Sequence, residues 1–110
     1  MAGESAALRG LRAMRVLLSE PSRWMKGWFA ETAKGQHTRG FDPFAVRFCI
    51  YGASEALRDH ELGTVIERRL CETLGVSEAG ELSRFNDAPT TTHADILALL
   101  DRAIAAEEAK

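Results

Sequence analysis

Apolar residues recur at helical spacing in three well-separated parts of the 110-residue chain, and this pattern restricts the possible folds more than any other feature. In the first part, from Ser5 to about Ser19, the recurring residues are Leu8, Leu11, Met14, Leu17 and Leu18. In the second they are Leu62, Val65, Ile66, Leu70 and Leu74, and in the third Ile96, Leu97, Leu100, Ala103 and Ile104. Residues three and four positions apart share one face of an α-helix. The pattern therefore predicts a mainly helical fold.

Capping residues mark the ends of these three helices. Ser5 is a suitable N-cap for the first helix, and Pro21 ends it. Gly75 directly follows the second helix, as glycine often does at a helix C-terminus. Thr92 and Asp95 have the spacing of a capping box, with Asp in place of the usual Glu, so the last helix is expected to begin after Thr92.

A further helix is predicted from Asp42 to about Asp59. Asp42 can accept a hydrogen bond from a free backbone N–H, and Pro43 suits the first helical position. The apolar residues wrap more than half of the circumference, which is typical of a central helix; they are Phe44, Ala45, Phe48, Cys49, Tyr51, Ala53, Ala56 and Leu57. Gly52 and Ala53 would form a flat patch that another backbone segment can approach closely.

Residues 24–41 lack clear helical periodicity and contain two tryptophans and three glycines, which favours a short β-hairpin. Residues 24–30 would form its first strand and residues 33–35 its turn. The expected fold is therefore mainly α, a single compact domain of about four helices with a short β-hairpin between helices 1 and 2. This domain spans residues 1–110, and we expect residues 1–4 and 106–110 to fray.

Composition places the chain among ordinary globular proteins, with 45% hydrophobic and 27% charged residues. The chain contains neither a signal-peptide core nor an apolar run of 18 residues, so we expect a cytoplasmic location and no membrane contact. Cys49 and Cys71 fall at apolar positions of predicted helices and are expected to be buried, reduced thiols. The oligomeric state is not indicated by these residues.

Charge is distributed unevenly along the chain. Residues 1–47 carry eight basic and four acidic side chains, a net charge of +4, whereas residues 48–110 carry six basic and twelve acidic side chains, a net charge of −6. Packing of the two halves against each other would neutralise this difference. The alternative is that the N-terminal half binds an anionic partner.

Nucleic acid is one such partner. Arg9, Arg12 and Arg15 lie three residues apart along the first helix, and Trp24 and Trp28 follow. Arginine can neutralise phosphates and tryptophan can stack on bases. A pI near 5.9 argues against a dedicated nucleic-acid-binding protein, so this partner is disfavoured.

Candidate catalytic residues are present without a supporting motif. Cys49, His93 and either Asp87 or Asn86 are the residue types of a Cys-His-Asp/Asn set. Cys49, however, would lie about two turns inside an apolar helix, where burial disfavours the thiolate. Catalysis is therefore disfavoured, and no catalytic residue is assigned.

The sequence predicts neither a metal site nor a cofactor. Residues 60–64 begin like the zinc-protease motif H-E-x-x-H, but Thr64 stands where the second histidine is needed. His37, His60 and His93 are scattered, and no glycine-rich phosphate-binding motif is present.

Four segments in this order resemble an uncharacterised family of small bacterial and phage proteins: Trp24-Met25-Lys26-Gly27-Trp28-Phe29-Ala30, Cys49-Ile50-Tyr51-Gly52-Ala53, Phe85-Asn86-Asp87 and Thr92-His93-Ala94-Asp95-Ile96-Leu97. The family pattern is W-x-x-G, C-x-x-G-A, W-N-D and T-x-x-x-V-L before a C-terminal helix. The resemblance covers residues 8–104 and implies a shared fold without an established activity. Phe85 stands where this pattern has tryptophan, which keeps the aromatic ring and loses the indole N–H donor.

Residues 84–95 are dense in hydrogen-bonding side chains and are expected to form a loop that runs into the last helix. We hypothesise that this loop lies against Gly52 and Ala53. Asn86 and Asp87 would then bond backbone groups, and Phe85 would fill the core.

The expected function is non-enzymatic binding of a macromolecular partner, specifically another protein. Aromatic and basic residues favoured at interfaces are found in and beside the hairpin: Trp24, Lys26, Trp28 and Arg39. The alternative is a small-molecule or anion-binding pocket, which could serve a Cys/His-dependent enzyme, walled by Trp24, Trp28, Cys49, Asn86, Asp87 and His93. A binding domain would expose an apolar patch containing tryptophan, whereas a pocket protein would gather polar groups in a concavity with Cys49 accessible.

Overall fold

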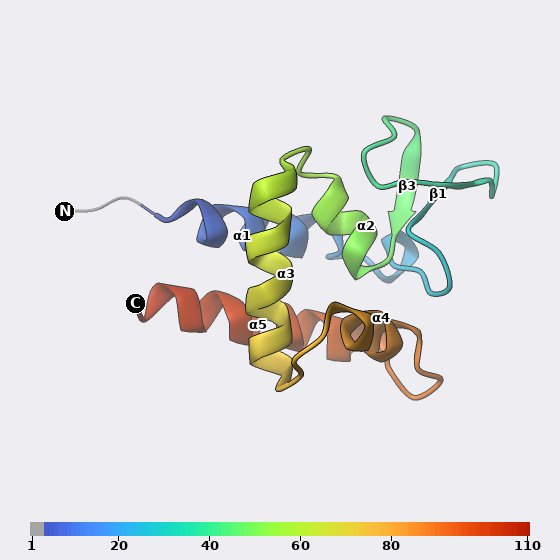
Figure 1. The fold of residues 1–110 in the computed structure, drawn as a ribbon. Coiled ribbons are helices and arrows are strands. Elements are labelled where there is room, and N and C mark those ends of the chain that lie inside the picture. The colour runs from blue at the N-terminus through green and yellow to red at the C-terminus, as the bar shows by residue number, and fades with distance from the viewer. Residues whose placement is uncertain (1–3) are drawn as a thin grey trace.

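The computed structural model describes residues 4–110 (Figure 1). Its helical elements are α1 (Ala6–Leu17), a 3₁₀ turn (Pro21–Arg23), α2 (Ile50–Glu55), α3 (His60–Leu74), α4 (Ala79–Asp87) and α5 (His93–Glu108). The strands β1 (Ala30–Thr32), β2 (His37–Thr38) and β3 (Ala45–Phe48) form an antiparallel sheet in the order β2-β1-β3. The sheet lies at one end of the molecule, and the start of α1 and the end of α5 lie at the other (Figure 1).

Helices α1 and α5 pack side by side and run in opposite directions, and α3 packs against both (Figure 1). Ion pairs join the two long helices: Arg12 contacts Glu108 at 2.5 Å, and the Arg15 Nε atom lies 2.8 Å from Asp101 Oδ1. Both pairs connect a basic residue of the first half of the chain to an acidic residue of the second half. Packing of the halves against each other therefore neutralises part of the uneven charge.

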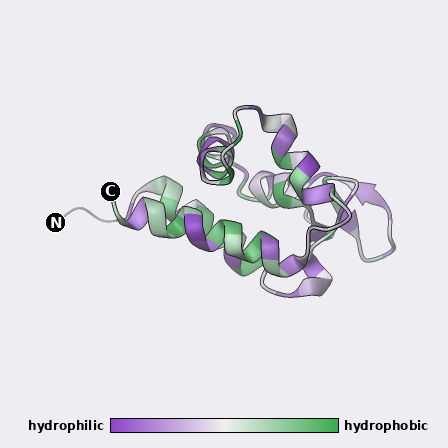
Figure 2. Ribbon diagram, turned by 90° about the horizontal axis from the view of Figure 1, so that it is seen from below, coloured by the Kyte–Doolittle hydropathy of each residue, from purple (hydrophilic) through white to green (hydrophobic). Residues whose placement is uncertain are grey.

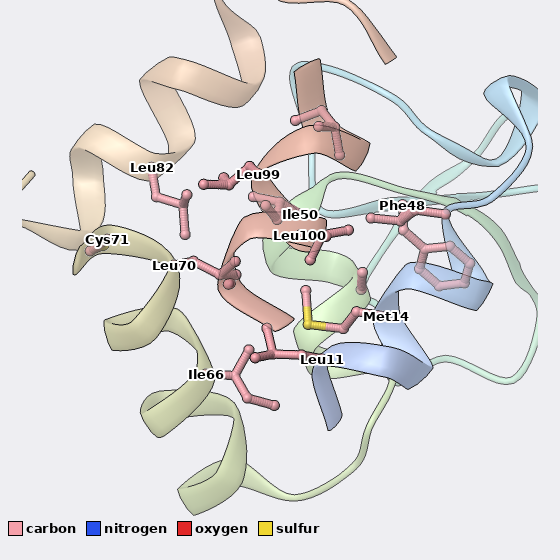
Figure 3. Packing of buried hydrophobic residues seen from close by; sticks show 14 of the residues in the cluster. Leu11, Met14, Phe48, Ile50, Ile66, Leu70, Cys71, Leu82, Leu99 and Leu100 are labelled. Carbon is pink, nitrogen blue, oxygen red and sulfur yellow. The ribbon is translucent and has the colours of Figure 1, made fainter. Parts of the chain in front are cut away.

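The hydrophobic core lies where α1, α3, α4 and α5 meet, and Figure 3 shows their apolar side chains converging there. Leu11 of α1 and Ile66 of α3 point toward each other in this view. Hydrophobic and hydrophilic residues alternate along the helices, as Figure 2 shows, so each helix buries one face. The apolar faces predicted for the first helix, for residues 62–74 and for the last helix are confirmed.

The predicted caps of these helices are also confirmed. The Ser5 hydroxyl accepts a hydrogen bond from Leu8 N at 3.1 Å, and Gly75 adopts the left-handed conformation with φ 84° after α3. Thr92 and Asp95 form the expected capping box at the start of α5. The helix α5 continues to Glu108, through part of the segment expected to fray; of the N-terminal residues expected to fray, residues 1–3 lie outside the described part of the chain.

The single helix predicted from Asp42 to about Asp59 is wrong, because this segment contains strand β3 followed by the short helix α2. The Asp42 carboxylate accepts hydrogen bonds from Phe44 N at 2.9 Å and from the Thr38 hydroxyl at 2.5 Å, which holds residues 42–44 in a turn. Residues 45–48 then pair with β1. An apolar run that covers most of a helix circumference can equally be a strand, and here pairing with β1 decides between them.

The predicted hairpin is present, but its first strand is misplaced. The strands are residues 30–32 and 37–38, with the expected turn at residues 33–35 and Gly35 at φ 81°. Residues 24–29 are not a strand; Trp24 makes only an isolated bridge with Phe48. The hairpin therefore belongs to a three-stranded sheet that includes β3, and Figure 1 shows β1 and β3 side by side.

Helix α4 differs from the prediction, since residues 84–95 are expected to form a loop and residues 84–87 belong to this helix. The Glu81 carboxylate accepts hydrogen bonds from the backbone of Ser77 and Glu78, which caps the first turn. Leu82 fills the core and Phe85 packs against it. Only two large apolar residues in nine give too weak a periodic signal to reveal such a short helix.

The close approach predicted at Gly52 is present, but a different segment makes it. A Cβ atom at Gly52 would lie 1.8 Å from the carbonyl oxygen of Phe29, and a Cβ atom at Gly40 would lie 1.8 Å from the carbonyl oxygen of Gly52. Cys49 N also donates to that Phe29 oxygen at 3.0 Å. The absence of side chains at Gly40 and Gly52 therefore allows the sheet to sit directly against α2.

We predict that Gly52→Ala lowers the free energy of unfolding by at least about 2 kcal/mol, because the new methyl group forces the sheet away from α2. The matched control is Gly80→Ala in α4, where a Cβ atom meets nothing within 4 Å. This control is expected to raise stability by about 0.5 kcal/mol through helix propensity. Urea unfolding followed by circular dichroism measures both changes, and equal effects of the two variants would contradict the prediction.

Candidate functional site

Asn86 lies in the last turn of α4 and is only 1% exposed. Its Oδ1 atom accepts hydrogen bonds from the Trp24 indole Nε1 at 2.8 Å and from Ile50 N at 3.1 Å. Its Nδ2 atom donates to Met25 O at 3.1 Å and to Asp87 Oδ1 at 2.9 Å. An asparagine amide has two donor hydrogens and an oxygen with two lone pairs, so all of its hydrogen-bonding capacity is used.

Asp87 extends this arrangement, because its Oδ1 atom also accepts from Gly27 N at 3.0 Å. Beside it, the Lys26 ammonium donates to Ala88 O at 2.6 Å and lies 5.4 Å from the centre of the Trp24 ring. We call the hydrogen-bonded set Trp24, Met25, Gly27, Ile50, Asn86 and Asp87 the Asn86 network. This network joins the segment before the sheet, the start of α2 and the end of α4.

Cys49 is the N-cap of α2, so its predicted position two turns inside a helix is wrong. Its Sγ atom accepts from Gly52 N at 3.3 Å, and the side chain is 8% exposed. Burial raises the pKa of the thiol, and the hydrogen bonds from backbone N–H groups only partly oppose this. Cys49 is therefore a capping thiol with little thiolate at neutral pH, as its predicted burial implied.

A hollow of about 140 Å³ lies beside the Asn86 network. Among the described residues it is lined by Gly27, Trp28, Phe29, Cys49, Ser83, Asn86 and Asp87. Pockets for small organic ligands usually measure about 300–1,000 Å³, so this hollow is small for such a ligand. The structure thus brings Trp28, Cys49, Asn86 and Asp87 together around a hollow that leaves little free space for a ligand.

Three of the four sequence segments that suggested a family meet in this one place. Trp24 of the first segment and Ile50 of the second both donate to the side-chain oxygen of Asn86, which belongs to the third. A family model matches residues 4–106 and is described as a family of unknown function, DUF6197. The chain belongs to this family. No curated protein and no solved structure matches the chain.

In this DUF6197 member, the ring of Phe85 packs against the hydrophobic core. The indole N–H that contacts Asn86 comes from Trp24, so the phenyl ring at position 85 leaves the Asn86 network complete. The hypothesis that Asn86 and Asp87 bond backbone groups agrees with these contacts. The surface of Gly52, however, is covered by the Phe29 backbone instead of by residues 85–87.

His93 does not line the hollow beside Cys49. It is the first residue of α5, and its Nε2 atom donates to the carbonyl oxygen of Leu18 at 2.6 Å. Its ring lies 6.2 Å from the Trp24 ring, tilted by 43°. These contacts link the start of α5 to the end of α1. Cys49 and His93 of the suggested catalytic set therefore each have their own structural contacts and do not line the same hollow.

Trp28 lies just before β1 and Arg39 just after β2. Both belong to a continuous series of contacts that involve aromatic rings. Trp28 stacks on His37 at 5.2 Å and meets Phe29 edge-on at 5.8 Å. The Arg39 guanidinium lies 4.2 Å from the Phe29 ring centre and 5.6 Å from that of Phe41. We call these five residues the aromatic strip. The sequence signalled Trp28 and Arg39, but the contacts of His37 with Trp28 and of Arg39 with Phe29 depend on the pairing of β1 with β2.

Across residues 4–110, no group of three or more His, Cys, Asp and Glu side chains is placed to hold a metal ion. None of the helices described has both the length and the apolar character needed to cross a bilayer.

We predict that Asn86→Ala lowers the free energy of unfolding by about 3–4 kcal/mol, since it leaves the buried partners from Trp24, Ile50 and Met25 without a bond. Trp24→Phe removes one donor and is expected to cost about 1 kcal/mol. Arg84→Ala, at an exposed position of the same helix, is the control and is expected to stay within about 0.5 kcal/mol. Urea unfolding followed by circular dichroism tests this order, and an Asn86→Ala effect no larger than the control would refute it.

We also predict slow modification of Cys49 by a thiol reagent at pH 7. Its raised pKa leaves less thiolate than a free cysteine has, and burial restricts access, so the rate should be at least about tenfold below that of a free thiol. Cys71 is also buried. Comparison of the Cys49→Ser and Cys71→Ser variants distinguishes the modification rate of Cys49 from that of Cys71. Modification of Cys49 at the rate of the unfolded chain would contradict this assignment.

Proposed function

We propose that this domain binds a protein partner through the aromatic strip together with Phe44 and Val46. One observation carries the proposal: exposed large apolar side chains are concentrated at the sheet end of the molecule. Of the five such side chains among residues 4–110, Trp28, Phe41, Phe44 and Val46 lie within residues 28–46, and only Val16 lies elsewhere. Contiguous exposed apolar surface is typical of interaction sites.

The chemistry of the strip supports a protein partner. Tryptophan and arginine are enriched among the residues that contribute most to protein interfaces. Trp28 is 45% exposed, and among the described residues its indole N–H has no acceptor, so it is free to donate to a partner. The ring of Phe44 is 75% exposed in the loop between β2 and β3.

The strip is held in place before any partner arrives. Arg39 is fixed by its ion pair with Glu55, and Gly40 N donates to the same carboxylate at 2.9 Å. The backbone of Phe29 is fixed against Gly52. A surface that is already ordered loses less conformational entropy on binding, which favours affinity.

Other residues proposed as contacts are used inside the protein. Trp24 is hydrogen-bonded to Asn86, and Lys26 donates to Ala88 O. The arginines that suggested nucleic acid are also engaged: Arg12 and Arg15 pair with acidic residues of α5, and Arg9 donates to Glu4 O at 2.6 Å. These contacts leave the sheet end as the better-supported surface and a protein as the better-supported partner.

We predict that Trp28→Ala and Phe44→Ala each weaken binding of the native partner at least about tenfold, because exposed aromatic side chains are the main contacts of the proposed surface. The partner is to be captured on immobilised domain, identified by mass spectrometry, and measured with purified components by calorimetry. Val16→Ala, an exposed apolar residue on α1, is the matched control and should leave affinity unchanged.

Circular dichroism and urea midpoints establish that the variants remain folded. Sedimentation of the domain alone shows whether the surface pairs with a second copy instead. Retention of affinity in both aromatic variants, or an equal loss in Val16→Ala, would refute the proposed surface.

A further inference from the structure

A second and larger cavity, of about 440 Å³, lies between α2, α3 and the segment after β2. Its volume falls within the usual range for small-molecule pockets. Ser54 and Glu55 of α2, Arg39 and Phe41 of the segment after β2, and residues at the start of α3 line its walls. None of the residues predicted to wall a pocket lines this cavity, whereas Arg39, predicted as an interface residue, does.

The wall formed by α3 is polar along one helical face. His60, Gly63, Thr64 and Glu67 are spaced by three and four residues, so they share that face, and all four line the cavity. The core face of the same helix carries Ile66 and Leu70. Helix α3 thus packs with its apolar face and presents a polar one to an open space.

Ser54 and Glu67 form the most enclosed polar contact of this cavity. The Ser54 hydroxyl, only 2% exposed, donates to Glu67 Oε2 at 2.8 Å. Gly63 makes room for this contact, because a Cβ atom there would lie 2.9 Å from the Ser54 oxygen. Among residues 4–110 no basic side chain forms an ion pair with Glu67, and burial raises the pKa of its carboxyl group.

The hydroxyl groups that line the cavity have already donated their protons to the protein. Ser54 donates to Glu67, and Thr64 donates to His60 O at 3.0 Å. Their oxygens therefore offer only lone pairs to a ligand. Three acceptors, namely the two hydroxyl oxygens and the Glu67 carboxylate, match a group that carries several N–H donors and no acceptor.

The net charge of the residues that line the cavity also favours a ligand with a positive charge. Glu55 is neutralised by Arg39, and Asp59 caps α3 by accepting from Leu62 N at 3.0 Å. With His60 counted as neutral, the lining carries two positive and three negative groups: Arg39, Arg58, Glu55, Asp59 and Glu67. One negative charge is therefore left without compensation, and Glu67 is the enclosed carboxylate without an ion pair.

We propose that this cavity binds a small molecule bearing a primary ammonium group, with Glu67 as the counter-ion and Ser54 and Thr64 as further acceptors. Phe41 supplies an apolar wall for the carbon chain of the ligand. An ammonium group satisfies all of these features at once, since it has one positive charge and three donors. Arg39 and Phe41 belong both to the cavity lining and to the aromatic strip, whereas the three acceptor residues belong to the cavity alone and can be tested separately from the protein partner.

The test uses n-butylammonium as the probe, with n-butyrate and n-butanol as controls of similar size and different charge. Two-dimensional ¹H–¹⁵N NMR follows the backbone amides of Ser54, Gly63 and Thr64. We expect n-butylammonium to shift these signals in a saturable manner and the two controls to leave them unchanged. Equal shifts from n-butyrate or n-butanol would overturn the proposal.

The decisive variant is Glu67→Gln, which keeps the shape and the acceptor for Ser54 while removing the charge. It should weaken n-butylammonium binding at least about tenfold, because a charge-assisted hydrogen bond is replaced by a neutral one. Glu72→Gln, an exposed residue of the same helix that pairs with Arg69, should bind the probe as the unmodified domain does. Unchanged binding in Glu67→Gln would overturn the proposal.

A measurement on the unmodified protein covers the case in which Glu67→Gln does not fold. Carboxyl ¹³C NMR follows the titration of Glu67 with and without saturating n-butylammonium. A bound cation stabilises the carboxylate and must lower the pKa of Glu67. The carboxyl signal of Glu72 serves as the internal control and should not respond to the amine, and an unaltered Glu67 titration would also overturn the proposal.

Discussion

The buried amide of Asn86 is the interaction on which the rest of the structure depends. It accepts from the first backbone N–H of α2, at Ile50, and it also binds Trp24 and Met25 ahead of the sheet. The position of α2 then determines two further regions. Gly52 supports the backbone of Phe29 in the aromatic strip, while Ser54 and Glu55 line the larger cavity. One side chain in α4 therefore fixes both surfaces that the domain presents.

Hydrogen bonds have this role because the sheet contributes little to the apolar core. Its buried apolar side chains are Ala30 and Phe48, whereas the remainder of the core comes mainly from the helices. Burial of so little apolar surface would hold three short strands only weakly. The Asn86 network and the contact between Gly52 and Phe29 supply the missing attachment. In a low-dielectric interior such a fully satisfied network also selects one arrangement, since any shift leaves buried groups unpaired.

The sequence predicted those parts of the fold that are determined locally. Capping by Ser5, Thr92 and Gly75 and the spacing of apolar residues located α1, α3 and α5, because short-range geometry controls both signals. The prediction was wrong where contacts between residues far apart in the chain determine the secondary structure. Residues 45–48 are a strand because β1 lies beside them, and α4 is a helix with only two large apolar side chains, Leu82 and Phe85, packed on the core. The density of polar groups at residues 84–95 directed attention to Asn86, but its partners Trp24 and Ile50 lie 62 and 36 residues away in the chain. The cavity at Glu67 had no sequence signal, since it exists only through the packing of α2 on α3.

Arg39 and Phe41 belong to both surfaces, so each surface has to be tested through residues that belong to it alone. The guanidinium of Arg39 covers Phe29 and Phe41 in the strip, and its ion pair with Glu55 forms part of the cavity wall. Removing Arg39 would release Glu55 as a second uncompensated carboxylate and would uncover two rings at once. A substitution of Arg39 alters both the strip and the cavity, so its effect cannot be assigned to one of them. Trp28 belongs to the strip without lining this cavity, and Glu67 lines the cavity without being a member of the strip. Substitution of Trp28 therefore tests the proposed protein surface, and substitution of Glu67 tests the proposed amine site, without either change removing a residue that both share.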